Sequence, residues 1–514
     1  MINEKGLKTY SKKERNMYFI GMAGQNCIYS TISCILAYYF QFTLLIPAAT
    51  VSIAMTIARV WDAFNDPMMG TIVDRTRTKW GKCRPYLLFV PIPVSILTTL
   101  CFTNFGFYNT DASLYTGKNL LVVLWSSLIY ILWGMTYTAG DIPLWGITAL
   151  MTEDHEDRDK LLSFARIAGG VGAALPYVGA QSIALGLGKF FAGKVGDPAQ
   201  GEKIGFFVSA LMLSIVGGAL FQLAGLFSEE KIAPSEEKHT LKENFALMWK
   251  NKPFRQILLS GVLSSPASLV MIAATPLITY YYSNKDSKLY LVYIIVLGGA
   301  IFLGQFGAMA LVPKILKHTT KKKAYNYSRL LSVIPYSVIF VLYLLSPRGM
   351  TKPLFVVLAF LIFVVAGASL GITNVLQSIM IADAVDYEEY HNGIRPDGAF
   401  FSGQTFIAKL TAGIATILSG IAYSVVGFSD ANVAKVNEYI ANGGIARENP
   451  EFTKYMTLLF FLVSIPPAIG NLLAAIPTWH YCLDDDEHLR ILDELNERRR
   501  TAEGEERVET AETV

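Results

Sequence analysis

The sequence predicts an all-α membrane protein with about twelve spanning helices arranged as two six-helix bundles. Only 17% of its 514 residues are charged, whereas a soluble chain usually carries about 25%. Hydrophobic residues make up 52% of the chain and occur in long blocks. A block of about 18 or more apolar residues is long enough to cross a bilayer as a helix. The loops between these blocks alternate between rich and poor in Lys and Arg.

The spans follow one another along the chain with short polar connections. They are expected at residues 17–45, 47–73, 85–107, 119–148, 160–188, 203–227, 253–282, 289–314, 324–346, 353–382, 399–427 and 453–479. Several of them begin at a proline, whose missing N–H is harmless in the first turn of a helix.

Basic residues predict the orientation of these spans. The loops 74–84, 228–252 and 314–323 are rich in Lys and Arg, whereas 104–119 and 345–352 contain few. Lys and Arg accumulate in the cytoplasmic loops of membrane proteins. We therefore expect a multi-pass protein of the plasma (inner) membrane with both termini in the cytoplasm. Cys83, in a basic loop, is expected to react with an impermeant thiol reagent only from that side.

The long loop after the sixth span divides the chain into two halves. We expect a cytoplasmic N-terminus at 1–16, an N-terminal bundle at 17–227, a central loop at 228–252, a C-terminal bundle at 253–479 and a cytoplasmic tail at 480–514. Basic loops hold the same place in each half, as in transporters built from two related bundles. The tail is polar and is predicted to form a short solvated helix.

Composition excludes several other classes of protein. The net charge of +3 is too small to indicate a nucleic-acid partner. None of the five cysteines forms a CxxC pair, so no zinc or redox motif of that kind is expected. We expect no cofactor and no enzymatic activity. All six histidines fall in predicted loops or at helix ends, so any proton coupling would depend on carboxylates.

Acidic residues inside the second span are the first functional candidates, because charge within a bilayer is costly. Asp62 and Asp66 are four residues apart and therefore lie on one helix face. Two neighbouring carboxylates repel each other, and a bound cation or a shared proton relieves that repulsion. Thr138 of the fourth span could add a hydroxyl to a site for Na⁺ or H⁺. The alternative is a structural ion pair between Arg59 and one of the acids.

Asp141 and Trp145 lie one turn apart in the fourth span. A carboxylate accepts hydrogen bonds from hydroxyls, and an indole face packs against apolar C–H groups. The pair therefore suits a sugar ring. The alternative for Trp145 is a place in the aromatic belt at the membrane interface.

Two basic residues lie within later spans. Arg166 is near the start of the fifth span, where its side chain could enter a cavity or extend to the membrane surface. Lys409 is about ten residues into the eleventh span, too deep to extend easily to the surface. We expect it to face a polar cavity.

Three segments of the chain carry long and specific motifs. The first is RVWDAFNDPMMG at 59–70, with DRTRT at 74–78 and WGK at 80–82. The second is WGMTYT at 133–138, followed by DIP at 141–143, and the third is ADAVDY at 382–387 with GIR at 393–395. These segments resemble the signature of the glycoside–pentoside–hexuronide:cation symporters of the major facilitator superfamily, and the third resembles that family's loop after the tenth span. The resemblance extends over nearly the whole chain up to about residue 480.

This resemblance implies the major facilitator fold and cation-coupled sugar symport by alternating access. It implies a cation site at Asp62, Asp66, Asn65 and Thr138, in which the acids would be metal ligands only if the ion is Na⁺. It implies sugar contacts at Asn26, Asp141, Trp145, Arg166, Asn374, Gln404, Thr405 and Lys409. It implies gating residues at Arg59, Asp383, Asp386 and Arg395.

Two positions depart from the family pattern. An acidic residue of the first helix is replaced by Asn26, and a tryptophan of the tenth helix by Asn374. Both changes concern sugar contacts, and both amides still donate and accept hydrogen bonds. The expected partners are a glycoside or oligosaccharide, the coupling cation and the lipid bilayer, with the protein as a monomer.

Three alternatives remain open at this point. One is a symporter for a non-sugar solute such as an amphipathic lipid, and another is a sugar sensor that does not transport. A third is a membrane glycosidase that uses Asp62 and Asp66 as a carboxylate pair about 5 Å apart. The position of both acids on one helix argues against that enzyme.

Overall fold

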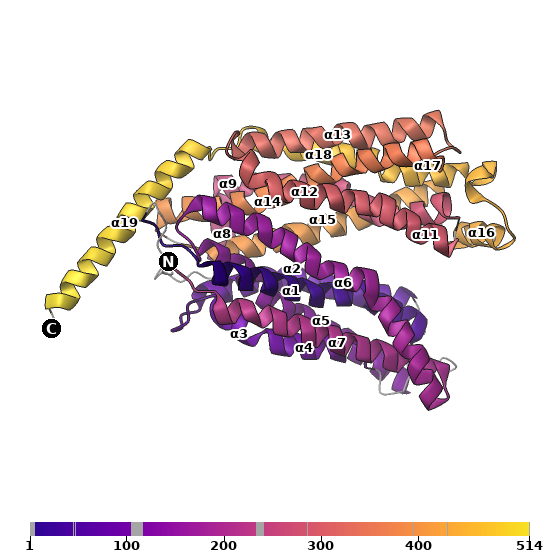
Figure 1. Ribbon diagram of the computed structural model, residues 1–514, viewed down its shortest axis with the longest axis horizontal. Helices are drawn as coiled ribbons and strands as arrows, with labels where there is room; N and C mark the ends of the chain where they lie inside the picture. Colours follow the sequence, from indigo (N-terminus) through magenta and orange to yellow (C-terminus); the bar gives the residue numbers. More distant parts are fainter. Residues whose placement is uncertain are drawn as a thin grey trace. The chain divides into compact units, whose positions relative to one another are not determined.

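The computed structural model describes residues 6–44, 46, 48–103, 117–232, 241–284, 286–393, 395–428 and 430–512, and its regular elements there are helices (Figure 1). Nine helices in this part of the chain are long and apolar enough to cross a membrane. A tenth span is counted if a pair of helices with a 45° bend is taken as one. The predicted all-α membrane fold is confirmed, and the count of twelve spans stays a prediction.

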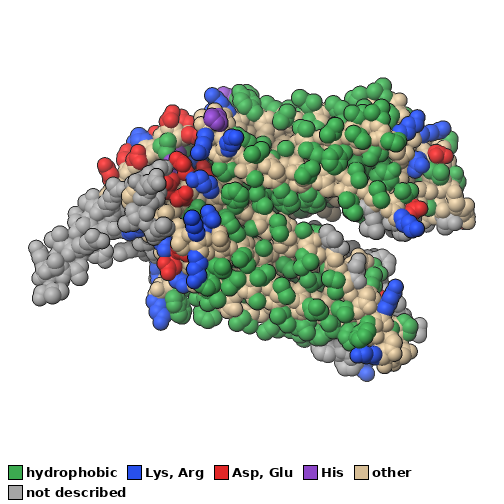
Figure 2. Space-filling model, viewed as in Figure 1, with side chains coloured by type: hydrophobic (Ala, Val, Ile, Leu, Met, Phe, Trp, Pro, Cys, Tyr) green, Lys and Arg blue, Asp and Glu red, His purple; other side chains and the backbone are tan. Residues whose placement is uncertain are grey.

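The chain packs as two compact units. The first unit comprises Met1–Leu247 and Glu388–Thr405, and the second comprises Met248–Tyr387 and Phe406–Val514. Residues 388–405 lie far along the sequence, within the predicted C-terminal bundle, and pack with the first unit. In each unit, hydrophobic side chains cover the length of the helices and charged side chains gather at the helix ends (Figure 2).

The first unit holds the earlier helices of the chain. They are α1 (Lys12–Tyr38), α2 (Ala48–Arg75), α3 (Arg84–Phe89), α4 (Pro91–Leu100), α5 (Gly117–Gly146), α6 (His155–Val195), α7 (Pro198–Phe227) and most of α8 (Leu241–Lys250). Small residues let α1 approach α6 and α7 closely. A Cβ on Gly172 of α6 would overlap the backbone of Ala23, so the helices meet backbone to backbone.

The second unit holds most of the later helices. They are α9 (Lys252–Leu263), α10 (Leu269–Leu277), α11 (Ser287–Tyr293), α12 (Gly299–Ile315), α13 (Lys321–Leu345), α14 (Pro353–Asn392), α15 (Asp397–Val426), α16 (Asp430–Ala441), α17 (Thr453–Leu462), α18 (Ile465–Trp479) and α19 (Asp485–Glu512). The end of α14 after Tyr387 and the start of α15 up to Thr405 belong to the first unit. An aromatic cluster fills its core, where the rings of Tyr343 and Phe460 stack with centroids 4.2 Å apart and Tyr281 meets Phe460 edge-on.

Two helices differ from the sequence prediction. Segment 382–387 was expected to be a loop, but α14 continues through it to Asn392. After Gly371 the sequence contains no Gly or Pro until Gly393, which adopts φ +70 and ends the helix. The loop prediction is wrong, and Asp383 and Asp386 are buried on a helix.

The tail is the second difference. The predicted helix is present as α19, but its first turns are packed rather than solvated. His488, Ile491, Leu492 and Leu495 are all buried. Their spacing of three, four and seven residues places them on one helix face. Because the tail is polar overall, the packing of this short apolar stripe was not predicted.

Cys83 differs as well. Its side chain is fully buried at the start of α3. Burial, followed by the nearby carboxylate of Glu230, raises the pKa of its thiol well above the usual range. A buried, protonated thiol reacts slowly, so the expected labelling of Cys83 from the cytoplasmic side is not supported by the folded structure.

Candidate functional site

The acid pair of α2 lies against α5. Asp66 is fully buried, and the Thr138 hydroxyl donates a hydrogen bond to its Oδ1 at 2.9 Å. One turn earlier on each helix, Asp62 lies over Gly134, where an added Cβ would come within 2.9 Å of the Asp62 Oδ1 atom. The residue pairs 62 and 66 on α2 and 134 and 138 on α5 therefore face each other turn by turn. The predicted neighbourhood of Asp62, Asp66 and Thr138 is present in the structure.

Asn65 completes this acid pair's surroundings. It is buried, and its amide nitrogen makes no hydrogen bond within the described part of the chain. A buried polar atom without a partner costs free energy, and such atoms often mark a place for a ligand or water. The Arg59 side chain lies outside the part that the structure describes, so the predicted ion pair with the acids stays untested.

Asp141 is the centre of a polar network between α1, α5 and the start of α15. The Gln25 amide donates to its Oδ1 at 2.8 Å and also to the hydroxyl of Tyr137. The Thr405 hydroxyl lies 3.5 Å from the other carboxylate oxygen. Asn26 reaches this network only through its neighbour, since its amide donates to Gln25 Oε1 at 2.8 Å. Asn26 therefore supports Gln25, and Gln25 makes the direct contact with Asp141.

Trp145 and Arg166 form a stacked pair. The guanidinium carbon of Arg166 lies 4.2 Å from the centroid of the Trp145 ring. Trp145 is 7% exposed, unlike an aromatic residue that faces lipid at the membrane interface. A cation–π contact of this kind orients both side chains. One indole face is covered by Arg166, so a sugar could stack only on the other face or after the guanidinium moves.

The remaining predicted sugar contacts are distributed over α14 and α15. Gln404 is buried, and its Oε1 makes no hydrogen bond within the described residues. It lies beside Thr405 in the part of α15 that packs with the first unit. Lys409, one turn further along α15, and Asn374 of α14 are half-buried and belong to the second unit.

The predicted gating residue Arg395 lies in a buried charge network of the first unit. Its guanidinium contacts Glu389 and lies 3.4 Å from Asp397, and it donates to the Ala149 carbonyl oxygen at 2.8 Å. Lys82 joins the same network through Asp397 at 2.7 Å. Burial alone would lower the pKa of Lys82, but the carboxylates of Asp397 and Asp74 outweigh burial and raise it.

Asp74 binds the N-terminus of α15. Its two carboxylate oxygens accept hydrogen bonds from the backbone N–H groups of Gly398 and Ala399 at 2.8 and 2.7 Å. Free N–H groups at a helix N-terminus favour a negative charge. This contact, together with the Lys82 ion pairs, joins the distant segment 388–405 to the first unit.

The other predicted gating acids, Asp383 and Asp386, belong to the second unit. Asp383 Oδ2 lies 2.5 Å from the Lys321 ammonium, and His488 Nε2 lies 3.4 Å from Asp383 and 3.1 Å from Asp386. The gating set predicted from sequence is therefore divided between two networks, one in each unit.

Several residues in these networks were not among the predicted site residues. Gln25 precedes Asn26, and a difference of one position turns a side chain about 100° around a helix. The sequence alone therefore does not decide which of the two side chains faces Asp141. Asp74 and Lys82 lie in the recognised motif, yet their partner Asp397 is more than 300 positions away in the chain. No local spacing rule could have identified that contact.

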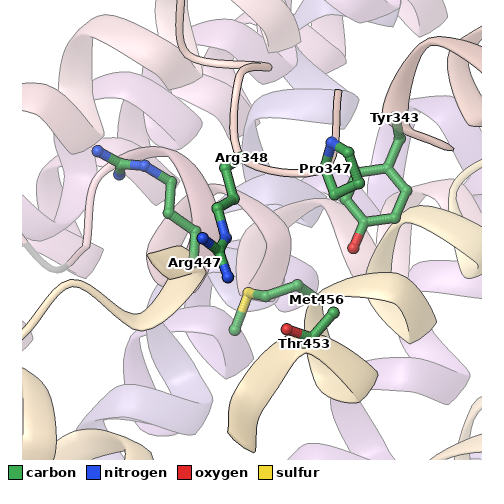
Figure 3. Close-up of a pocket in the computed structure, with 6 residues that line it drawn as sticks. All are labelled: Tyr343, Pro347, Arg348, Arg447, Thr453 and Met456. Atoms are coloured by element: carbon green, nitrogen blue, oxygen red, sulfur yellow. The ribbon is translucent and has the colours of Figure 1, made fainter. Parts of the chain in front are cut away.

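A separate pocket lies in the second unit. Its volume is about 230 Å³, and its lining residues are Tyr343, Pro347, Arg348, Arg447, Thr453 and Met456 (Figure 3). Figure 3 shows the Arg447 guanidinium pointing away from Met456. It donates a hydrogen bond to the Tyr281 carbonyl oxygen at 3.1 Å. None of the predicted site residues lines this pocket.

Comparison with known proteins decides the family. Residues 17–485 match the family model described as MFS/sugar transport protein. The chain belongs to this family. It is a multi-pass membrane transporter of the major facilitator superfamily, among the glycoside–pentoside–hexuronide symporters, and not an enzyme.

Curated relatives resemble the chain over most of its length. An isoprimeverose transporter of Lactiplantibacillus pentosus is 26% identical over 81% of this chain and 80% of its own. A glucuronide carrier protein homolog of Escherichia coli (strain K12) is 25% identical over 94% of this chain and 95% of its own. A putative glycoside/cation symporter, YagG, of the same organism is 26% identical over 81% of this chain and 84% of its own.

Solved structures share the fold at lower identity. A bacterial homologue of the iron transporter ferroportin, in the outward-facing state, aligns with a TM-score of 0.60 and 13% identity over 91% of this chain and 99% of its own. The proton:xylose symporter XylE aligns with a TM-score of 0.55 and 12% identity over 94% of this chain and 98% of its own. Together they confirm the major facilitator fold predicted from sequence.

Proposed function

We propose that this protein is a secondary active transporter that couples Na⁺ or H⁺ movement to the uptake of a glycoside or oligosaccharide. The family membership and the names of the relatives support sugar as the solute and a cation as the driving ion. The single observation that carries the proposal is the acid pair on α2, in which Asp66 is fully buried and Asp62 is half-buried. Its neighbour on α5 is a hydroxyl, which suits a small cation that enters and leaves.

The cation site comprises Asp62, Asp66, Asn65 and Thr138. Carboxylate and hydroxyl oxygens are ligands for Na⁺, and the same carboxylates can carry a proton. Binding of either cation relieves repulsion between the two acids. An occupied site would therefore stabilise the packing of α2 against α5, and this change in packing is how the cation could influence the rest of the bundle.

The sugar site is centred on Asp141. Its carboxylate is already organised by Gln25 and Thr405, and a sugar hydroxyl could add to or replace one of these partners. The buried Oε1 of Gln404 offers an acceptor for a second hydroxyl. Trp145 and Arg166 supply an aromatic surface and a donor next to it, with Asn26 as support for Gln25. The family resemblance also makes Asn374 and Lys409 candidates for sugar contacts.

The two charge networks are proposed as gates. In the family mechanism one side of the bundle closes as the other opens, so contacts at the helix ends must form and break. Arg395 and Arg59 would act from the first unit, and Asp383 and Asp386 from the second. In each network, an exchange of ion-pair partners would change which arrangement of the helix ends is more stable.

Transport assays in proteoliposomes test this function. Purified protein is reconstituted, and uptake of a panel of labelled pentosides, glucuronides and oligosaccharides is measured with an inward Na⁺ gradient, an inward H⁺ gradient or neither. We expect accumulation against a gradient for at least one sugar with one of the two ions. Binding of a sugar without any counterflow would instead identify a sensor, and uptake of a lipid probe alone would overturn the sugar assignment.

The orientation is proposed from the basic loops, with both termini in the cytoplasm of a plasma-membrane protein. Cys482 tests it, because it is an exposed thiol beside the tail. Burial of part of the group raises the pKa of this thiol, and Lys252 opposes the rise. Labelling by an impermeant reagent should therefore accelerate as the pH rises, and only in inside-out vesicles. A Cys482→Ser protein is the control, and labelling in right-side-out vesicles would reverse the topology.

A further inference from the structure

The first turns of α19 place an imidazole against the two buried acids of α14. His488 Nε2 lies 3.4 Å from Asp383 Oδ1 and 3.1 Å from Asp386 Oδ2. All three side chains are at most 3% exposed. Their ligand atoms lie within 4.8 Å of one another. The cluster therefore combines one imidazole nitrogen and two carboxylate oxygens from two helices that are about 100 residues apart in the chain.

We propose that Asp383, Asp386 and His488 form a binding site for a divalent transition cation of the Zn²⁺ type. Zn²⁺ is bound by imidazole and carboxylate ligands about 2.0–2.1 Å away, in tetrahedral geometry. The ligand atoms of such a tetrahedron are about 3.3–3.4 Å apart. The two nitrogen–oxygen distances at His488 are within 0.3 Å of that separation. The missing CxxC pair argues only against thiolate sites and not against this one.

Lys321 is the competitor of the ion. Its ammonium lies 2.5 Å from Asp383 Oδ2 and 3.3 Å from His488 Nδ1. A metal at Nε2 leaves the proton of the neutral ring on Nδ1, and an N–H there cannot accept from an ammonium. The metal and the inward position of Lys321 therefore exclude each other. The affinity for the ion should rise when the Lys321 charge is removed.

Lys321 also contacts the start of α19 through its backbone. Its N–H donates to Asp485 Oδ2 at 3.0 Å. Burial raises the pKa of Asp485, and Lys321 opposes that rise. A divalent cation carries the charge that neutralises the two ligand carboxylates.

A bound ion would hold α19 of the tail against the proposed gating acids of α14. It would connect the first turn of α19 with the last turns of α14, where the proposed gating acids lie. The role in gating rests on the proposed function, whereas the binding site itself does not. Metal bound to the acids would withdraw them from any other partner. We therefore expect divalent transition-metal cations, added on the side of the membrane where the tail lies, to inhibit transport.

Binding of Zn²⁺ and Co²⁺ to the purified full-length protein tests the site. We expect one ion per chain by calorimetry, and Co²⁺ should show the visible absorption bands of a four-coordinate N/O site. His488→Gln keeps a hydrogen-bond donor near the acids but lacks a good metal ligand. It should therefore fold normally, and its affinity for Zn²⁺ and Co²⁺ should fall by about a hundredfold. Asp386→Asn should behave the same way.

Two further variants make the test specific. Lys321→Met should bind Zn²⁺ more tightly than the parent, and Zn²⁺ should raise its melting temperature more. Lys323→Met, an exposed neighbour on the same helix turn, should change neither quantity. His391→Ala, an exposed histidine near the end of α14, is the control for adventitious histidine binding. An unchanged Co²⁺ spectrum in His488→Gln, or weaker binding by Lys321→Met, overturns the proposal whatever the outcome of the transport assays.

Discussion

The acid pairs of α2 and α14 share their chemistry and differ in their surroundings. Asp62 and Asp66 lie four residues apart on α2 and face α5, where Thr138 donates a neutral hydroxyl hydrogen bond. Asp383 and Asp386 lie three residues apart on α14 and face the Lys321 ammonium and the His488 imidazole. The first pair has a neighbour that a small cation can share. The second pair already has a cation supplied by its own chain.

This difference suggests separate tasks for the two acid pairs. A contact between helices can use a permanent counter-ion, since breaking it moves the helices and not an ion. The α14 pair, with Lys321 and His488 at bonding distance, therefore fits holding and releasing a helix end. The α2 pair is proposed for coupling because the Thr138 hydroxyl beside it offers an oxygen that a small cation can share.

Removing one acid of the α2 pair should have the largest effect. In Asp66→Asn the remaining carboxylate no longer needs a cation to relieve repulsion, so cation stimulation of uptake should disappear. Sugar binding measured without the coupling ion should stay close to that of the parent. Asp493→Asn, an exposed acid of α19, is the matched control. Unchanged Na⁺ or H⁺ stimulation in Asp66→Asn would remove this residue from the cation site.

Removing the counter-ion of the α14 pair should affect stability. Lys321→Met leaves the Asp383 carboxylate buried with only part of its hydrogen bonding, and loss of a charged hydrogen bond costs about 1.5–3 kcal/mol. The melting temperature in detergent without added metal should fall accordingly. Lys323→Met should change the unfolding free energy by less than about 0.5 kcal/mol, as is usual for exposed positions. Equal melting temperatures would mean that the Lys321 contact contributes nothing.

The contact between Asp66 and Thr138 could be predicted from sequence. The four-residue spacing of Asp62 and Asp66 fixes one face of α2, and the motif on α5 places Thr138 near it. The sequence could not show which of Gln25 and Asn26 meets Asp141, because both lie in one helical turn. It also could not show that Asp74 meets the start of α15, since that contact joins segments more than 300 positions apart.

The surroundings of Asp383 and Asp386 were missed for a different reason. The helical spacing of the buried residues was present in the sequence, but the high content of charged residues in the tail led to the prediction of a solvated helix. The buried residues of the tail, His488 and its three apolar companions, follow the spacing of a helix face, yet they lie among many charged residues that suggest solvent. Segment 382–387 was assigned to a loop by resemblance, although it lacks any residue that ends a helix. Local propensity was the better guide at that position.

The sugar-binding network should respond less strongly than the cation site. Asp141→Asn keeps the shape of the side chain but removes its charge, and a hydrogen bond to a charged group contributes about 1.5–3 kcal/mol. Sugar affinity should therefore fall roughly ten- to a hundredfold. Asn26→Ala removes only the support of Gln25 and should cost on the order of 1 kcal/mol. An Asp141→Asn protein that binds every sugar as tightly as the parent would show that the sugar site is elsewhere.

The smallest effect is expected at Thr138. Thr138→Val removes one neutral hydroxyl at nearly constant volume, and a neutral hydrogen bond contributes about 0.5–1.5 kcal/mol. The concentration of cation that gives half-maximal stimulation should rise about two- to tenfold, with the maximal stimulation retained. Thr138→Ser, which keeps the hydroxyl, should restore most of the affinity. If Thr138→Val behaves as the parent and Asp66→Asn does not, the hydroxyl orients the carboxylate only in the cation-free state and is not a ligand. If Thr138→Val abolishes stimulation as completely as Asp66→Asn, the neutral partner is as important as the charge, and the contrast between the two acid pairs fails.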